Sequence, residues 1–407
     1  MIKDFKFNSF ALLFSSLKNR NFRFLLLANA CSFVSLWGQT TVLYLYILNL
    51  TNSAGQVTLV GFVSVLPLVL FGMIGGHLPS KFQEKRILQT VEGLSLLSSL
   101  AIAVFLFVDL NTVWIAYIGG FFVGIRFPLI FPSFRILVRK EVKKENLTNA
   151  IALETASFQL GKVLGPIIAG FLILNLNFAY ALLSGTIMTL ISLGLIVQIK
   201  PTVHKFLPQK QPSGKKGLFS LLKNPYLFAT LFATLFFNIL VFTHDPMVPI
   251  LANSFLTSNA FLIGVLIASG GIGGILGSLL IALLKLPDKF FFFVFILGCF
   301  IGGIALLLFS ASKIYLLSIL CLIFLGIGGS MFATMQGMLV FSIAPESLQG
   351  KMFGILTVII GGSPFGYLLL SYLAETNGPV FALQHYGIAS IICFSLISIY
   401  ILLKRKR

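Results

Sequence analysis

Long apolar segments follow one another along almost the whole chain, separated by short polar connections. Each is about as long as the roughly 20 apolar residues that a helix needs to cross a bilayer. Backbone polar groups in lipid must be satisfied within the segment, and the alternation typical of barrel strands is absent, so helices are predicted. The pattern predicts an all-α membrane protein with twelve transmembrane spans, at approximately 24–48, 56–78, 87–108, 112–138, 149–174, 177–198, 226–250, 259–284, 290–311, 314–342, 351–373 and 380–403.

Composition agrees with this pattern, because 57% of the residues are hydrophobic and only 10% are charged. A soluble domain could not cover so much apolar surface, whereas the lipid-facing surface of a membrane protein is itself apolar. The spans and their connections use up the 407 residues, so no appended enzyme domain is expected. The four cysteines lie singly in apolar segments, which argues against disulfides, and no metal or cofactor is expected.

Lys and Arg residues gather on one side of the predicted membrane. With the N-terminus inside, the inner segments hold 26 of the 29 cations, and the other three are Lys313, Arg126 and Lys162. Since cytoplasmic loops collect Lys and Arg, both termini are predicted to be cytoplasmic, in a bacterial inner (plasma) membrane. The net charge of +18 is therefore spread over many inner segments, and no nucleic-acid binding is expected.

The chain divides into two similar halves. A polar, basic loop separates six spans from six, which predicts an N-terminal bundle at 1–198, a cytoplasmic linker at 199–225 and a C-terminal bundle at 226–407. Two similar halves around a midplane site are a recurrent transporter plan. One offset of 201 residues relates glycines of the two halves: Gly72 to Gly273, Gly76 to Gly277, Gly161 to Gly362 and Gly165 to Gly366.

The loop after the second span reads G-H-L-P-S-K-F-Q-E-K-R over 76–86. It resembles the G-x-L-x-D-R-x-G-R-R signature of the major facilitator superfamily, where this loop acts as a charge-linked latch between the halves. Ser80 stands at the aspartate position, and Glu84 is the carboxylate that could replace it; the alternative is a plain basic loop. Four residues fit the signature: Gly76, Leu78, Lys81 and Lys85.

The fifth span contains G-K-V-L-G-P-I-I-A-G over 161–170, which resembles the antiporter motif of drug–proton exchangers in that superfamily. Glycines one turn apart allow close backbone approach, and the proline permits a bend. In the superfamily, spans 5 and 8 face each other between the halves, so a sliding contact is predicted, against the alternative of ordinary glycine packing. The residues concerned are Gly161, Gly165, Pro166 and Gly170 in span 5, with Gly273 and Gly277 in span 8.

Further stretches resemble the branch of that superfamily that contains macrolide-efflux and enterobactin (siderophore) exporters. They are L-T-N-S-A over 50–54, Pro67, and A-P-E-S-L-Q-G-K over 344–351. The resemblance covers essentially the whole chain and implies the major facilitator fold of two pseudo-symmetric six-helix bundles. One departure is Gly120, which stands about where drug exporters carry an arginine early in span 4.

Arg126 and Lys162 lie at membrane depth, each roughly 18–20 Å above the inner boundary at about 1.5 Å per residue. Ionisable residues there face a partner or a water-filled cavity. Either they form structural ion pairs with Glu92 or Glu154, or they bind substrate, which would favour an organic anion. Uncharged substrate-binding candidates, equally compatible with ordinary packing, are Trp37, Gln39, Asn238 and Tyr367.

No G-x-x-x-x-G-K-[ST] nucleotide-binding loop occurs, so proton exchange through a buried carboxylate is the expected energy source. Glu154 is the first candidate, followed by Asp245 and Glu92; an interfacial acid near the outer end of span 7 is the alternative for Asp245. The leading hypothesis is a monomeric secondary transporter that exports a small organic molecule by proton antiport, with a siderophore-like anion favoured. The alternatives are multidrug or macrolide efflux, uptake of a nutrient anion, and a non-transporting membrane receptor or assembly partner.

Overall fold

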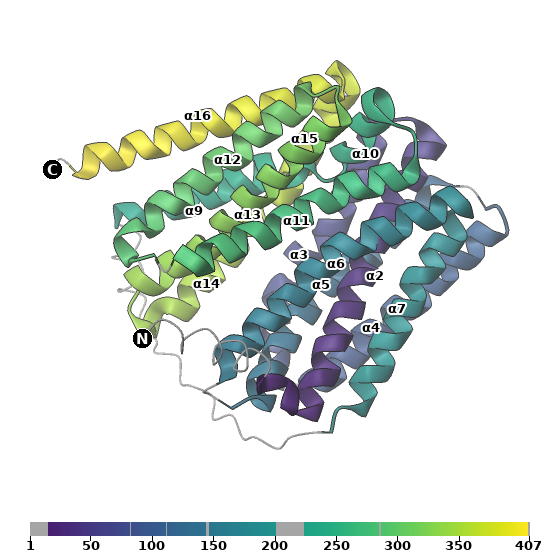
Figure 1. Ribbon diagram of the computed structural model, residues 1–407, viewed down its shortest axis with the longest axis horizontal. Helices are drawn as coiled ribbons and strands as arrows, with labels where there is room; N and C mark the ends of the chain where they lie inside the picture. Colours follow the sequence, from purple (N-terminus) through teal and green to yellow (C-terminus); the bar gives the residue numbers. More distant parts are fainter. Residues whose placement is uncertain are drawn as a thin grey trace, which may run out of the picture.

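The computed structural model describes residues 15–81, 83–110, 112–143, 146–200, 224–284 and 286–405. These residues are almost entirely helical, and among them twelve helical segments are long and apolar enough to cross a membrane (Figure 1). The prediction of an all-α membrane protein with twelve spans is confirmed. The side chains at 72–82 and the segment 201–223 lie outside the described part of the chain.

Six long helices form the first half, after the short helix η1 (Ser15–Lys18). α2 packs against α6 and α7, α3 against α5, and α4 against both α5 and α7. Asparagine caps begin two of them: the side chain of Asn19 accepts the N–H of Phe22, and that of Asn177 accepts the N–H of Tyr180. The helices are α2 (Arg20–Thr51), α3 (Ala54–Lys81), α4 (Glu84–Phe107), α5 (Val113–Glu141), α6 (Leu147–Asn175) and α7 (Phe178–Gln198).

The second half begins at Asn224, whose side chain accepts the N–H groups of Tyr226 and Leu227 and so caps the first turn. α12 packs against α13 and α16, and α11 packs against α13. Its helices, apart from the irregular seventh span, are α9 (Pro225–Phe236), α11 (Ala260–Leu284), η6 (Asp288–Phe290), α12 (Phe291–Ala311), α13 (Tyr315–Ile343), α14 (Glu346–Ile360), α15 (Ser363–Asn377) and α16 (Pro379–Arg405).

The seventh span is not the continuous helix predicted at 226–250. After α9 it continues as a π-helical turn, η3 (Phe237–Val241), then as η4 (Phe242–His244), α10 (Met247–Leu251) and a second π-helical turn, η5 (Ala252–Leu256). Pro246 and Pro249 carry no N–H, so the α-helical hydrogen-bond ladder cannot run through them. Short π and 3₁₀ turns take up the difference, as they often do near functional sites.

The eleventh span is also broken, although one helix was predicted at 351–373. α14 ends at Ile360, and α15 starts at Ser363 after Gly361 and Gly362. Pro364 lies in the first turn of α15, where its missing N–H costs no helical hydrogen bond. The sequence pattern could not show this break, because apolar residues continue on both sides of it.

The two halves meet mainly where α6 packs on α11 and α3 packs on α15. We call the end that carries Arg20, Lys85 and Lys404 the basic end, and the other the opposite end. The described close approaches between the halves run from Gln159 and Gly274, near the middle, to the opposite end. Figure 1 shows the halves together at the upper right and splayed toward the left and bottom, which is the basic end.

Candidate functional site

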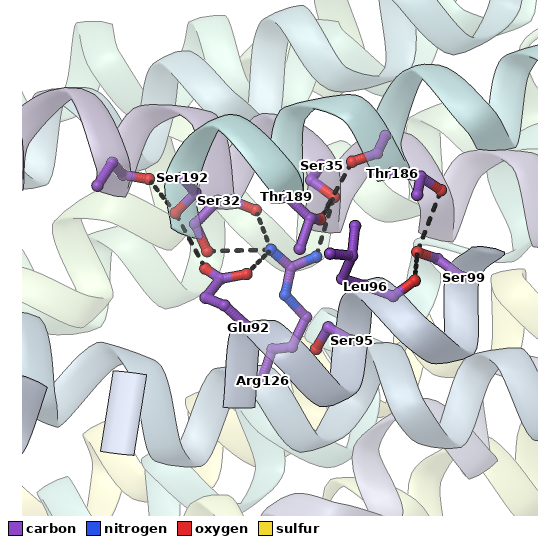
Figure 2. A network of polar contacts seen from close by, with 12 residues as sticks. Ser32, Ser35, Glu92, Ser95, Leu96, Ser99, Arg126, Thr186, Thr189 and Ser192 are labelled. Atoms are coloured by element: carbon purple, nitrogen blue, oxygen red, sulfur yellow. Dashed lines mark hydrogen bonds and ion pairs between the residues drawn. The ribbon is translucent and has the colours of Figure 1, made fainter. Parts of the chain in front are cut away.

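Arg126, on α5, lies at the centre of a polar network inside the first half (Figure 2). The residue is fully buried, and its Nη2 atom lies 3.2 Å from the carboxylate of Glu92 on α4. Nη2 also donates to the carbonyl of Ser32 at 2.8 Å and to its hydroxyl at 3.0 Å, while Nη1 donates to the Ser35 hydroxyl at 3.0 Å. The guanidinium therefore joins α5 to α4 and α2.

The network extends to a fourth helix. The other carboxylate oxygen of Glu92 accepts from Ser192 on α7 at 3.2 Å, and the Thr189 hydroxyl of α7 lies 2.7 Å from that of Ser35. Of the alternatives left open by the sequence, this geometry is that of a structural ion pair between Glu92 and Arg126. The depths estimated from the sequence had separated the two residues, and the 3.2 Å contact shows that the long Arg126 side chain spans that difference.

Glu154, on α6, pairs with a different cation from the one expected. Its Oε2 atom accepts from Nε of Arg135 on α5 at 3.0 Å, and that guanidinium also lies 4.9 Å from the ring centroid of Phe131. The carboxylate is 2% exposed, and its Oε1 atom has no hydrogen-bond partner among the described residues. Glu154 is thus held inside the first half and does not compensate Lys162.

Lys162 lies where the halves meet. Its Nζ atom is 4.9 Å from the ring centroid of Trp37 on α2, which is a cation–π contact. A Cβ atom added to Gly271 of α11 would lie 3.2 Å from the Cβ atom of Lys162. Among the residues that the structure describes, no carboxylate lies within 4.0 Å of its ammonium group. Lys162 therefore carries a membrane-depth charge that no close acid balances.

Asp245 and His244 reach the same region from the irregular seventh span. The Nε2 atom of His244 lies 3.3 Å from Oδ1 of Asp245, and its Nδ1 atom lies 2.8 Å from the carbonyl of Val241. Short α-helical and π-helical turns carry the span on to Leu256, beyond the predicted limit of residue 250. Asp245 therefore lies within the irregular part of the span and stays a predicted proton-coupling residue.

Two tyrosines complete this region. The aromatic ring of Tyr367 on α15 and the hydroxyl of Tyr44 on α2 both approach Gly61 of α3, where an added Cβ would lie 2.7 Å and 3.3 Å from them. Both tyrosines interact electrostatically with Asp245, and Lys162 does so with His244. We call this set the central cluster: Trp37, Tyr44, Lys162, His244, Asp245 and Tyr367. It draws residues from both halves.

Two predicted residues lie elsewhere. Gln39 is 1% exposed, and its side chain packs against Gly185 of α7 within the first half. The amide of Asn238 donates to the carbonyl of Thr234 one turn earlier in its own span. His244 and Tyr44 were not among the site residues predicted from the sequence. For His244 the only signal was its position beside Asp245.

Two of the antiporter-motif glycines, Gly161 and Gly165, pack against α2 and not against span 8. A Cβ on Gly161 would lie 2.6 Å from the carbonyl carbon of Phe33, and one on Gly165 would lie 2.6 Å from the amide nitrogen of Gly38. Both approaches are to α2, within the first half. The motif therefore allows α6 to pack closely on α2.

The predicted span 8 glycines, Gly273 and Gly277, also pack within their own half, because their close approaches are to α13. Spans 5 and 8 do pack together, and the motif residues Pro166 and Gly170 take part in the contact. The close approaches between them include Gly170 against the carbonyl of Ala260, and Gly264 against the carbonyl of Pro166.

The residues of the loop signature are only partly described. The side chains of Gly76, Leu78 and Lys81 lie outside the described part, although the backbone there continues α3. Lys85 donates from Nζ to the carbonyls of Val197 and Ile199, at 2.9 Å and 2.6 Å, and so caps the end of α7. The Lys85 ammonium group is thus engaged within its own half.

Solved structures with the same arrangement are membrane transporters. The POT family transporter PepTSo superposes with a TM-score of 0.75 at 13% identity, covering 96% of this chain and 99% of that one. A POT family transporter in complex with 5-aminolevulinic acid gives 0.75 at 12%, covering 94% and 96%. At these identities the likeness shows the fold alone.

A model of the Major Facilitator Superfamily matches residues 25–367, and the chain belongs to that family. It is 26% identical to the enterobactin exporter EntS of Shigella flexneri over 88% of this chain and 86% of that protein. It is 22% identical to the staphyloferrin A transporter of Staphylococcus aureus (strain NCTC 8325 / PS 47), over 89% and 91%. The resemblance inferred from the motifs is confirmed, and the protein is a membrane transporter rather than an enzyme.

Proposed function

We propose that this transporter exports a small organic anion of the siderophore type in exchange for protons, as a monomer in a bacterial inner membrane. In this proposal the segments 1–198 and 226–407 rock against each other about the linker 199–225, with the basic end in the cytoplasm. The splayed basic end is then the side from which substrate enters. The enterobactin and staphyloferrin A named for the two relatives supply the substrate class.

The observation that carries the proposal is Lys162 in the central cluster. The other described cation that was predicted at this depth, Arg126, is paired with Glu92 within the first half, and nearer the basic end Arg135 is paired with Glu154. Lys162 lies between the halves without a close carboxylate, so an anion entering there would gain a charge-assisted contact worth about 1.5–3 kcal/mol. Trp37 beneath its ammonium group adds a flat surface for an aromatic group of the substrate.

A second candidate, efflux of a macrolide-like drug, is favoured by an aromatic cluster on the first half. The rings of Phe127, Phe131 and Phe158 lie within 6.3 Å of one another, and Phe158 is 6.3 Å from Trp37. Such a surface would bind an uncharged apolar molecule without help from a cation. The charge on the substrate therefore separates the two candidates.

Everted membrane vesicles test the proposal, with radiolabelled enterobactin, staphyloferrin A and a macrolide as probes. An imposed proton gradient, acidic inside, should drive accumulation of a siderophore. In Lys162→Met, affinity for that probe should fall roughly 10- to 100-fold, the equivalent of one charge-assisted contact. The exposed Lys313→Met is the matched control and should behave as wild type.

Three results would overturn the proposal. Accumulation only in right-side-out cells would show uptake, and no accumulation in either orientation would favour a receptor or assembly partner. Accumulation of the macrolide alone, unaffected by Lys162→Met, would establish the second candidate instead.

A further inference from the structure

The irregular seventh span presents a histidine and a carboxylate side by side at membrane depth. His244 and Asp245 lie between the two π-helical turns of that span, and their exposed side-chain fractions are 6% and 26%. The histidine is held by the carbonyl of Val241, within its own span. The proposed binding of an anion by Lys162 and Trp37 does not use this pair.

The donors and acceptors of the two side chains determine how many protons the pair must hold for them to form a hydrogen bond. A carbonyl oxygen only accepts, so Nδ1 of His244, 2.8 Å from the Val241 carbonyl, carries a hydrogen. A neutral imidazole then has a bare lone pair on Nε2, which faces Oδ1 of Asp245 at 3.3 Å. An ionised carboxylate also offers only lone pairs, so a single additional proton between the two atoms turns a repulsive contact into a hydrogen bond.

We propose that His244 and Asp245 share one exchangeable proton, and that this is the proton taken up and released during the transport cycle. The inference rests on the proposed proton antiport and names its site. The step forms an N–H bond on Nε2 or an O–H bond on Oδ1 and breaks one in a hydronium ion, and the reverse occurs on release. No other reactant is required.

The charge of the pair acts on side chains of both halves. Those that interact with it electrostatically are Lys162 from α6, Tyr44 from α2 and Tyr367 from α15. Without the shared proton the pair carries one negative charge on the second half, which attracts Lys162 on the first half. With the proton the pair is neutral and the attraction is lost.

This attraction supplies a rule for exchange. In this proposal the empty, deprotonated protein favours the state that is closed at the opposite end, because Lys162 and the negatively charged His244–Asp245 pair lie on opposite halves and attract each other. A proton on the pair, or an anion on Lys162, removes one of the two attracting charges. Either ligand therefore releases the closed state, whereas the empty protein stays in it, which is what coupled exchange requires.

The other membrane-depth carboxylates suit this task less well. Glu92 and Glu154 each contact an arginine inside the first half, at 3.2 Å and 3.0 Å, so protonating either would break a buried ion pair. Asp245 instead contacts a histidine, the side chain whose ordinary titration lies closest to neutral pH. It is also partly exposed, which gives protons a path to it.

Asp245→Asn and His244→Gln test the inference in vesicles, with Asp288→Asn as a matched control outside the spans. Proton-driven accumulation of the siderophore probe, and probe-driven alkalinisation or acidification, should be lost in both variants. Counterflow of labelled against unlabelled probe needs no net proton movement and should persist, which also shows that the variants are folded.

Retained proton-driven accumulation in Asp245→Asn would overturn the inference, as would loss of counterflow together with coupling. Loss of coupling in Glu154→Gln alone would transfer the proton site to that carboxylate. Failure of the proposed function looks different, because wild type would then show no counterflow of either siderophore.

Discussion

Replacing Arg126 by methionine should destabilise the protein strongly, because the substitution leaves a buried charge without its partner. Glu92 is fully buried in the first half, and after Arg126→Met only Ser192 would still donate to its carboxylate. Breaking a buried ion pair by removing one partner costs about 3–5 kcal/mol. The hydrogen bonds lost by Ser32 and Ser35 add less, at roughly 0.6 kcal/mol each in a helical membrane protein.

The double variant Arg126→Met with Glu92→Met distinguishes the cost of an unpaired charge from the cost of lost packing. Methionine has a similar length and no charge, and replacing a whole buried pair by apolar residues is often neutral or stabilising, within about 1–4 kcal/mol. The double variant should therefore be more stable than Arg126→Met alone. The exposed Arg139→Met on the same helix is the matched control and should leave stability unchanged.

Unfolding of the purified protein by increasing SDS in mixed micelles, followed by far-UV circular dichroism, measures these free energies. A wild-type midpoint for Arg126→Met would refute the buried pair, and so would a double variant as unstable as the single one. Transport gives the second readout. A well-folded double variant that no longer transports would favour the alternative interpretation of the sequence, in which Arg126 binds substrate.

Three further predictions concern close contacts. Gly165→Ala places a Cβ 2.6 Å from backbone and should cost about 1–3 kcal/mol, whereas Gly194→Ala meets nothing within 4 Å; equal thermal midpoints would contradict this. Glu375→Gln weakens the 2.8 Å hydrogen bond from the Ser53 hydroxyl across the halves, so amide hydrogen exchange at the start of α3 should become faster. Unchanged exchange would show that this hydrogen bond does not hold the halves together. Gly170→Ala crowds α11 between the halves and should slow siderophore transport without changing expression; a wild-type rate would show that the contact is free to yield.

Span number and type could be predicted from the sequence because lipid imposes a strong rule: every crossing must be a long apolar helix. The breaks at Gly361 and around Asp245 could not. Hydropathy is unchanged by them, and a helix interrupted by proline or glycine remains as apolar as a regular one. The consequence for the candidate site is large, since both His244 and Asp245 of the central cluster lie in the irregular part of span 7.

Candidate residues could be selected by type, but their partners could not be assigned. Arg126 and Lys162 look alike in the sequence, as single cations in apolar spans at similar depth. One faces the interior of its own half and meets Glu92; the other faces the second half and meets Trp37. Which face of a helix is turned inward depends on packing against neighbours distant in the chain, and the nearly uniform hydrophobicity of these spans gives no periodicity from which to read it.

The two halves, alike in helix number, are held together by different interactions. In the first half, ion pairs join α5 to α4 and to α6, and hydrogen bonds extend the network to α2 and α7. Relative movement of α4, α5 and α6 would therefore expose an unpaired charge to a medium of low polarity. In the second half the helices are joined by hydrogen bonds such as Gln336 to Thr234 and Tyr386 to the carbonyl of Gly366, at 2.7 Å and 2.6 Å, and the His244–Asp245 pair lies within a single span. Both interrupted spans also lie there. Hinges are element ends that absorb backbone change, so the second half is the one built to bend, and the first half is the rigid body from which Lys162 presents its charge to the second half.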